Sequence, residues 1–316
     1  MTHSNRTDMK PLAIVIPAYK ARFLGRTLHH IAEQSCNDFT LYIGDDNSPE
    51  NLKPIVEEYR DKIDIVYHRF EENMGGRDLT GHWERCIALS KEPLVWLFSD
   101  DDVMPKDGVE RVLREYSNHK EGVERLFMRL PLVVVDENEV VLHSNPPFDK
   151  PRISGYEFLL DKLSCKISSA AVEYIFSRDV LERCGGFVKF PVAWCSDDAS
   201  WAKFATYTNG IISLSGEAVG WRNAQGENIS NSTKYDSEKL DATAQFIRWI
   251  DTTFVKQMGA DKALKKSIRR YVHTILTCSV RGNYSIRQLF TLCQSIAAID
   301  ILSAVKTFTR HIRKRQ

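Results

Sequence analysis

The sequence predicts an α/β fold, with a doubly wound, mixed sheet and a helical extension at the C-terminal end. Three observations support this prediction. Short apolar runs alternate with amphipathic segments over the first 116 residues, as expected when helices connect parallel strands. Acidic residues directly follow two of these runs, at the edge where open α/β sheets bind ligands. Beyond residue 236 the apolar spacing is mostly helical.

Four apolar runs in the first third of the chain have the continuous apolar character of buried parallel strands. Pro17 closes the first run, and a polar turn at 44–49 ends the second. Between runs, apolar residues recur at helical intervals, as at Leu24, Leu28 and Ile31. The predicted strands cover 12–16, 39–43, 63–68 and 94–98, and the predicted helices cover 24–33, 52–59, 79–90 and 109–116.

After residue 116 the alternation is less regular. The predicted strands there cover 126–135, 139–143, 211–213 and 218–222, and the predicted helices cover 155–163, 177–184 and 198–206. An amphipathic stretch at 286–308, interrupted by Asp300, leads into a basic end at 310–315. We therefore predict an α/β domain over 1–235 and a basic helical region over 236–316.

The composition is typical of a soluble globular protein, since 43% of the residues are apolar and 27% are charged. The seven cysteines are odd in number and include no Cys-X-X-Cys pair, which predicts reduced thiols rather than a disulfide framework or a zinc ribbon. Residues 1–10 lack the apolar core of a secretory signal, and no stretch approaches the roughly 20 apolar residues of a spanning helix. A cytoplasmic protein is therefore expected.

Charge is unevenly distributed, although the net charge is only +1. Residues 256–316 carry 13 Lys and Arg against two acidic residues, a net charge of +11, whereas residues 1–255 carry −10. One interpretation is a solvated basic helical surface. Another is attraction to an anionic membrane face, where each basic residue contributes roughly 1 kcal/mol. Nucleic acid is not expected as a partner, because no aromatic-rich basic stripe accompanies the charge.

The acidic cluster Ser99-Asp100-Asp101-Asp102 follows the fourth predicted strand. Three adjacent carboxylates repel one another, so exposure to water or a bound cation must offset the repulsion. Mg²⁺ and Mn²⁺ prefer hard oxygen ligands and often bridge to substrate phosphates. The alternative is an acidic turn or a helix cap.

Three weaker motifs accompany this cluster. Asp45 and Asp46, after the second strand, can accept hydrogen bonds from a nucleobase or a ribose, or can cap the next helix. The turn at 73–77 offers backbone amides and a cation to a phosphate, or is a simple turn. Asp197 and Asp198 form an acidic pair before a predicted helix; such pairs raise the pKa of one member, which suits a general base, although capping is the alternative.

Taken together, these motifs resemble the family 2 glycosyltransferases of the GT-A fold, of the type that makes bacterial surface polysaccharides. The run at 13–19 is similar to that family's first strand and nucleotide loop, although Lys20 stands where Asn is usual. The segments 44–48, 73–77, 98–105, 185–187 and 196–198 resemble, in order, its base-binding, Asn-X-Gly, Asp-X-Asp, Gly-Gly-Phe and Glu-Asp motifs. The stretch at 223–225 lacks the His that the family often has there.

This resemblance implies an inverting glycosyltransferase with a nucleotide-binding half at about 11–105 and an acceptor half at 106–235. The residues implied around a nucleotide-sugar donor, most commonly UDP-linked, are Pro17, Ala18, Tyr19, Asp45, Asp46, Asn73, Gly75, Arg77, Asp100 and Asp101. Asp102 and Asp100 are implied as ligands of Mn²⁺ or Mg²⁺, and Asp198, with Asp197 as second choice, as the general base. The implied acceptor is a glycan or a lipid-linked hydroxyl at the inner face of the plasma membrane.

Three other functions match parts of the pattern. A non-catalytic nucleotide-sugar-binding subunit would bind the donor without turnover. A phosphohydrolase of the haloacid type also uses Asp-X-Asp, but places it after its first strand, whereas here the motif follows the fourth. A nucleotidyltransferase has a similar fold, but the Gly-rich basic loop expected after its first strand is absent from this sequence.

Overall fold

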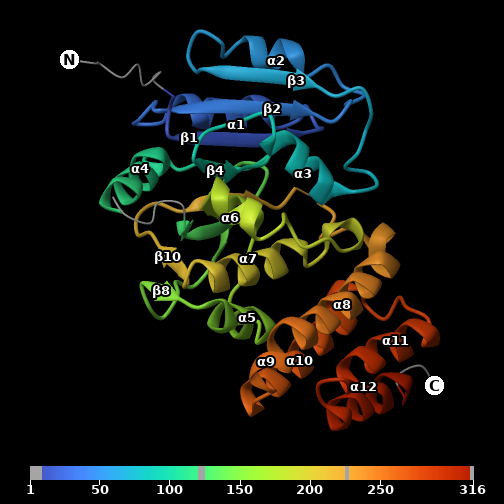
Figure 1. The fold of residues 1–316 in the computed structure, drawn as a ribbon. Helices are drawn as coiled ribbons and strands as arrows, with labels where there is room; N and C mark the ends of the chain where they lie inside the picture. Colours follow the sequence, from blue (N-terminus) through green and yellow to red (C-terminus); the bar gives the residue numbers. More distant parts are fainter. Residues whose placement is uncertain (1–8, 120–124, 225–227, 314–316) are drawn as a thin grey trace.

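The computed structural model describes residues 9–119, 125–224 and 228–313, and it confirms the α/β fold. An eight-stranded mixed sheet has the order β3-β2-β1-β4-β9-β5-β10-β8, and a small sheet has the order β11-β6-β7. Figure 1 shows the C-terminal helices gathered at one end of this α/β body. The strands are β1 (Leu12–Ala18), β2 (Phe39–Asp45), β3 (Ile65–Arg69), β4 (Leu94–Leu97), β5 (Phe127–Arg129), β6 (Leu132–Val135), β7 (Val141–Ser144), β8 (Arg152–Ile153), β9 (Tyr174–Ser177), β10 (Ile211–Ser213) and β11 (Val219–Arg222).

The N-terminal half of the main sheet is parallel, as predicted. β1 lies between β2 and β4, and β3 pairs with the far side of β2. The register pairs Ala18 with Asp45, so β1 and β2 end side by side. Successive residues of β1 enter different hydrophobic clusters, since Ala13 and Val15 pack on one side and Ile14 on the other. Burial on both faces explains why this strand reads as one continuous apolar run.

Two predictions for the middle of the chain are wrong. Strand β9 was missed; it is fully buried and antiparallel to both β4 and β5. This strand was missed because a buried run of four residues is too short to show a period. The helix predicted at 177–184 is confirmed, with observed bounds of Arg178–Arg183. The single strand predicted at 126–135 is two strands in different sheets. Pro131 separates β5 from β6, since proline has no N–H to continue a ladder.

Helices cover the sheet and form the C-terminal region. Serine caps begin α5 and α11, where Ser154 and Ser285 each form a capping box with the third residue of the helix. The α-helices are α1 (Leu24–Ala32), α2 (Lys53–Glu57), α3 (Leu79–Ile87), α4 (Gly108–Asn118), α5 (Gly155–Leu163), α6 (Arg178–Arg183), α7 (Ser196–Tyr207), α8 (Asp236–Ile250), α9 (Lys256–Met258), α10 (Lys262–Thr274), α11 (Ile286–Ala297) and α12 (Ile301–Arg313).

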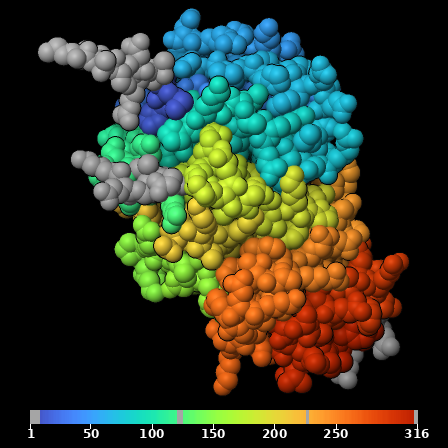
Figure 2. Space-filling view, in the orientation of Figure 1, coloured from blue at the N-terminus to red at the C-terminus, as the bar shows by residue number. Residues whose placement is uncertain are grey.

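The C-terminal helices pack directly on the α/β body, as the adjoining orange and yellow surfaces in Figure 2 show. One continuous hydrophobic cluster contains Val15 of β1, Trp201 of α7, Ile247 of α8 and Ile268 of α10. The amphipathic stretch at 286–308 divides into α11 and α12 around Asp300, and the two helices pack against each other. None of the helices in the described part of the chain is sufficiently long and apolar to cross a membrane. The basic end at 310–315 lies only partly within the described residues, and the domain division at 235 stays a prediction.

Candidate active site

Several predicted site residues lie at the carboxyl edge of the parallel strands. β1 ends at Ala18 and its neighbour β2 at Asp45, while Asp100 follows closely after β4. The backbone N–H of Tyr19 donates to Asp100 Oδ2 at 2.7 Å, which joins the loop after β1 to the acidic cluster. Neighbouring parallel strands end at one edge, so segments far apart in the sequence meet there.

Asp100 holds the loop after β1. Its Oδ2 accepts hydrogen bonds from the backbone N–H of Tyr19 and of Lys20, the latter at 2.9 Å. Burial, together with the neighbouring charge of Asp101, raises the pKa of Asp100 to about 7, against the lowering effect of the two amides. The protein itself therefore only partly offsets the negative charge at this position.

Asp102 is held by a residue of the small sheet. The backbone N–H of Arg222 donates to Asp102 Oδ1 at 2.6 Å, and Arg222 Nε donates to the carbonyl of Asp101 at 2.6 Å. The arginine side chain is fully buried and pairs with Glu139 at 2.9 Å. Burial and the charge of Asp101 raise the pKa of Asp102 well above its usual range. Arg222 thus links the acidic cluster to the segment between β6 and β7.

The acidic cluster has the donor chemistry for a divalent cation. The hydrogen bonds described above use one oxygen each of Asp100 and Asp102, and carboxylate oxygens are the ligands that Mg²⁺ and Mn²⁺ prefer. Within the described ranges, no group of three or more His, Cys, Asp or Glu side chains is arranged to hold a metal ion. Water and substrate phosphates would therefore complete the coordination, as is usual for Mg²⁺.

Asp45 ties the end of β2 to the end of β3. Its Oδ1 accepts a hydrogen bond from the backbone N–H of Ser48 at 2.7 Å. Its Oδ2 accepts from the Tyr67 hydroxyl at 2.5 Å and from Arg69 Nη1 at 2.8 Å. Burial and the hydrogen bond to Asp45 raise the pKa of Tyr67 to about 12. Asp45 is therefore held by one backbone amide, one phenol hydroxyl and one guanidinium group.

Asp46 organises the loop that contains Asn73 and Gly75. Its Oδ1 accepts from the Met74 N–H and its Oδ2 from the Gly75 N–H, each at 2.8 Å, and Asn73 Nδ2 donates to Oδ2 at 3.0 Å. Arg85 of α3 pairs with Oδ1. A Cβ atom at residue 75 would lie 2.7 Å from Asp46 Oδ2, so this close approach requires glycine. The motifs at 45–46 and 73–75 thus form one unit.

Arg77 lies at the rim of this unit. Its side chain is 75% exposed and pairs with Glu72 at 3.4 Å. It is accessible to an anion from solvent, and its contact with a phosphate stays a prediction.

The second acidic pair lies at the start of α7, which begins at Ser196. Asp198 is buried and pairs with Lys162 Nζ of α5 at 2.9 Å, while the Asp198 N–H donates to Asp197 Oδ1 at 2.9 Å. Burial and the charge of Asp198 raise the pKa of Asp197 to about 7, and the charge of Lys162 opposes this rise. The two carboxylates thus have different environments although they are adjacent in the chain.

The backbone before this pair is strained. Val192, Ala193 and Cys195 have φ values of 50°, 54° and 64°, in the left-handed region that non-glycine residues rarely adopt. Such residues cost about 1–3 kcal/mol each, and their strain persists only where surrounding contacts impose it. Ser196 and Ser200 supply such contacts, since their hydroxyls accept hydrogen bonds from the N–H groups of Phe190 and Val188 at 3.0 and 2.8 Å.

Sequence reasoning missed the partners that hold the predicted carboxylates. These are Tyr67, Arg69, Arg85, Lys162 and Arg222. Tyr67 and Arg69 are two residues apart at the end of β3, so both side chains lie on one face of the strand. This spacing could have identified them from the sequence. The other three act across long stretches of chain, where no local pattern marks them.

Two cavities lie away from these carboxylates. One, of about 290 Å³, is lined by residues of α4 and β10, and the other, of about 320 Å³, lies between the start of α8 and the loop before α11. Neither is lined by a predicted site residue. The candidate site is therefore defined by its carboxylates and not by either of these cavities.

Comparison with known proteins agrees with the family resemblance of the sequence motifs. The family model described as Glycosyl transferase family 2 matches residues 13–162. A putative teichuronic acid biosynthesis glycosyltransferase, TuaG, of Bacillus subtilis (strain 168) is 30% identical over 112 residues, covering 34% of this chain and 42% of that protein. The matches span only 16–42% of the length of the curated relatives.

Solved structures extend the likeness in fold over nearly the whole chain. The crystal structure of S. aureus TarS 1–349 with UDP-GlcNAc has a TM-score of 0.73 at 17% identity, covering 96% of this chain and 89% of that one. The mannosyltransferase PcManGT of Pyrobaculum calidifontis, with GDP-Man and Mn²⁺, has a TM-score of 0.51 at 13% identity, covering 91% and 73%. The C-terminal helices are therefore included in the region of shared fold with TarS.

Proposed function

Because the chain belongs to glycosyl transferase family 2, we propose that it is an inverting transferase that moves a sugar from a UDP-linked donor to a hydroxyl group. The acceptor in this proposal is a glycan or a lipid-linked glycan of a surface polysaccharide. The observation that carries the proposal is the meeting of Asp45, Asp46 and Asp100 at the carboxyl edge of neighbouring parallel strands. TarS, whose crystal structure contains UDP-GlcNAc, shares this fold.

The donor side is formed by the loops after β1, β2 and β3. Pro17, Ala18 and Tyr19 supply the wall of the donor side, and Asp100 fixes its end through the backbone amides of Tyr19 and Lys20. Asp45 and Asp46 hold the neighbouring loops, so their part in nucleoside binding includes the shape of the loop at 73–75 as well as direct contact. Arg77 at the rim is placed to meet a phosphate from solvent.

Asp100 and Asp102 would hold Mn²⁺ or Mg²⁺ beside the donor, with Asp101 next to them. When bound, the cation supplies Lewis-acid stabilisation of the charge that develops on the departing diphosphate. The solved mannosyltransferase with a similar fold contains Mn²⁺. Arg222 fixes the orientation of Asp102 through its backbone amide, so this part of the site is set before the donor arrives.

On the acceptor side, Asp198, with Asp197 as the second choice, accepts the proton of the attacking hydroxyl. The oxygen of that hydroxyl forms a bond to the anomeric carbon while the bond from that carbon to the diphosphate oxygen breaks. The electron pair of the broken bond leaves with the diphosphate. A single displacement inverts the anomeric carbon and requires no nucleophile from the protein.

A donor-hydrolysis screen tests this function without a known acceptor. Nucleotide release is measured from UDP-, GDP- and TDP-sugars with Mn²⁺ or with EDTA. We expect metal-dependent release from one UDP-sugar and its loss in Asp102→Ala. Absence of binding to any nucleotide or nucleotide sugar in the presence of Mn²⁺ would overturn the assignment.

We also propose that the C-terminal helices attach the protein to an anionic membrane face. Ile286, Phe290, Ile301, Leu302 and Val305, on α11 and α12, are each more than half exposed, within a region of net charge +11. Basic charge beside exposed apolar side chains fits an anionic lipid surface. Co-sedimentation with vesicles of phosphatidylglycerol, but not of phosphatidylcholine, is expected, with loss in Leu302→Ser/Val305→Ser. Equal sedimentation with both vesicle types, or with neither, would contradict it.

A further inference from the structure

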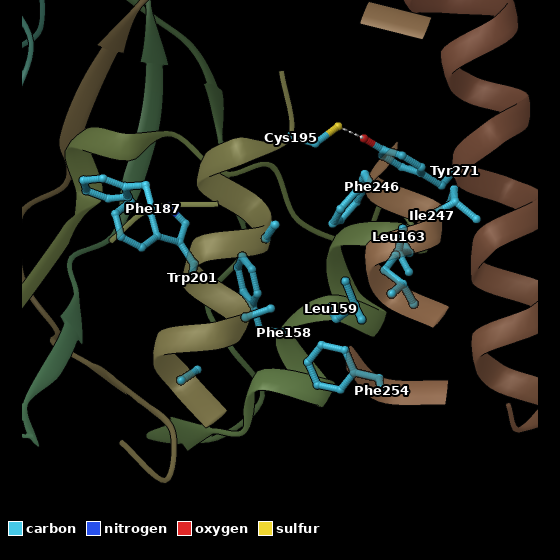
Figure 3. Packing of buried hydrophobic residues seen from close by; sticks show 14 of the residues in the cluster. Phe158, Leu159, Leu163, Phe187, Cys195, Trp201, Phe246, Ile247, Phe254 and Tyr271 are labelled. Atoms are coloured by element: carbon cyan, nitrogen blue, oxygen red, sulfur yellow. Dashed lines mark hydrogen bonds between the residues drawn. The ribbon is translucent and has the colours of Figure 1, made fainter. Parts of the chain in front are cut away.

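Side chains from two other helices contact the start of α7, where Asp197 and Asp198 lie. Lys162 of α5 pairs with Asp198 at 2.9 Å, and its side chain is only 17% exposed. Tyr271 of α10 contacts Cys195, with its hydroxyl 3.1 Å from the cysteine sulfur. Figure 3 shows this contact from α10 to the residue just before α7, above the packed side chains of α5, α7 and α8.

These two contacts act at the point where the backbone is strained. Cys195 is the N-cap of α7 and has a left-handed backbone, and the acidic pair follows within three residues. Strain of this kind relaxes unless contacts impose it, and Tyr271 is a buried contact at the strained residue itself. Lys162 in turn fixes the direction of the Asp198 carboxylate, which is buried and needs a counter-charge.

We propose that Lys162 and Tyr271 are positioning residues of the acceptor side, which hold the Asp197–Asp198 turn so that its carboxylates can take a proton from the attacking hydroxyl. The proposal rests on the transferase function above and extends it to the C-terminal helical region. Through Tyr271, α10 becomes part of the acceptor side.

The electrostatic surroundings of the pair include groups from four elements. Lys162 of α5 is the cation, while Cys195, Tyr271 of α10 and Tyr174 of β9 are buried groups whose pKa values are raised well above their usual range, so they stay neutral. The charge of Lys162 lowers the pKa of Asp197 against the effects of burial and of Asp198. Removal of Lys162 therefore favours the protonated form of Asp197 and takes away the counter-charge that pairs with Asp198.

The variant Lys162→Met of the full chain tests the role of Lys162. The measured quantity is the rate of UDP release from the UDP-sugar that the wild type hydrolyses. We expect kcat to fall roughly 100-fold, on the scale of general-base catalysis, and the acidic limb of the pH profile to move to higher pH. Lys162→Arg restores the charge and is expected to restore the position of the acidic limb. Tyr271→Phe, which removes only a hydroxyl group, is expected to lower kcat roughly tenfold without moving the limb.

Binding of UDP with Mn²⁺, measured by calorimetry, separates these effects from misfolding and is expected to be unchanged in all three variants. Lys166→Met, four residues further along and paired with Asp149 and Asp161 at the surface, is the matched control and is expected to match the wild type. Unchanged kcat and pH profile in a Lys162→Met variant that binds UDP would overturn the proposal. If that variant does not fold, wild-type kcat in Tyr271→Phe overturns it. A wild type that binds no nucleotide overturns the transferase function and this proposal together.

Discussion

The backbone N–H of Arg222 donates a hydrogen bond of 2.6 Å to Asp102 Oδ1, although the two residues are 120 positions apart in the chain. The same arginine pairs with Glu139 at 2.9 Å, and its guanidinium lies 4.6 Å from the centre of the Phe23 ring. One buried side chain therefore connects the acidic cluster, the small sheet and the segment before α1. The geometry of the predicted cation site depends on this connection.

Replacement of Arg222 by methionine should destabilise the protein and weaken metal-dependent donor binding. The substitution leaves Glu139 without its buried partner and removes the donors to three backbone carbonyl groups. Loss of a hydrogen bond from a charged donor costs about 1.5–3 kcal/mol, and urea unfolding measures the total effect. Arg26→Met is the control, because Arg26 also pairs with Glu139 but is 45% exposed, and should cost less than about 1 kcal/mol. Equal losses in both variants would show that burial of Arg222 has no special effect.

Replacement of Gly75 by alanine should weaken UDP binding more than it changes stability. The new methyl group would lie 2.7 Å from Asp46 Oδ2, so the loop at 73–77 must move away from the carboxylate. Steric changes of this kind cost typically about 1–3 kcal/mol, which corresponds to a loss of roughly 5- to 150-fold in affinity if the loop contacts the nucleotide. Titration calorimetry with UDP measures the change.

Gly25→Ala is the matched control for this substitution. A Cβ there meets Ile55 at 3.5 Å, an ordinary contact, within α1. It should leave UDP binding unchanged and preserve or slightly raise stability, because alanine favours a helix. Wild-type affinity in the Gly75 variant would contradict a role of this loop in nucleotide binding.

The parallel half of the fold and its acidic residues could be predicted because their signals are local. β1 is buried on both faces, so its apolar run stands out, and the aspartates follow directly after β2 and β4. β9 was missed because it has only four residues and lies between two antiparallel partners distant in the sequence. Its pairing is a property of the whole sheet, which no local window contains.

The partners of the site carboxylates were missed for a similar reason. Asp46 was predicted from its own motif. Its partner Arg85 is a partly exposed residue of α3, and an arginine at such a position has no distinctive sequence pattern. Lys162 likewise looks like an ordinary basic residue in the last turn of α5. Sequence motifs thus identify the groups that carry charge, whereas the tertiary fold determines which groups hold them in place.

His82 should make stability depend on pH between about 4 and 6.5. Burial, together with the charge of Arg85, lowers the pKa of His82 to about 4 against the attraction of Asp46, and Arg85 Nε donates to its Nδ1 at 3.0 Å. The unfolded chain, with a pKa near 6.5, binds more protons in this window, so stability rises with pH across it and falls as the solution is acidified. The full effect is roughly 3 kcal/mol.

Chemical denaturation of the wild type and of His82→Asn at pH 4.5 and pH 7 measures this effect. The variant retains an acceptor for Arg85 but has no titrating ring, so its loss of stability on acidification should be smaller. His68, which stacks edge-on against the same Phe70 ring but is more exposed, provides the control substitution His68→Asn. An identical pH dependence in all three proteins would show that His82 is not the group responsible.

The two aspartates at the start of α7 should differ in their effect on turnover. Asp198→Asn removes the proposed base and should lower UDP release by roughly 10²- to 10⁴-fold, with UDP affinity unchanged. Asp197→Asn keeps a side-chain oxygen that can accept the Asp198 N–H and should have a smaller effect. Because the pKa of Asp197 is raised to about 7, this variant should also change the pH profile near neutrality, where the wild type loses a negative charge on acidification. A larger loss in Asp197→Asn than in Asp198→Asn would exchange the two roles, with Asp197 as the base and Asp198 as the anion that Lys162 fixes beside it.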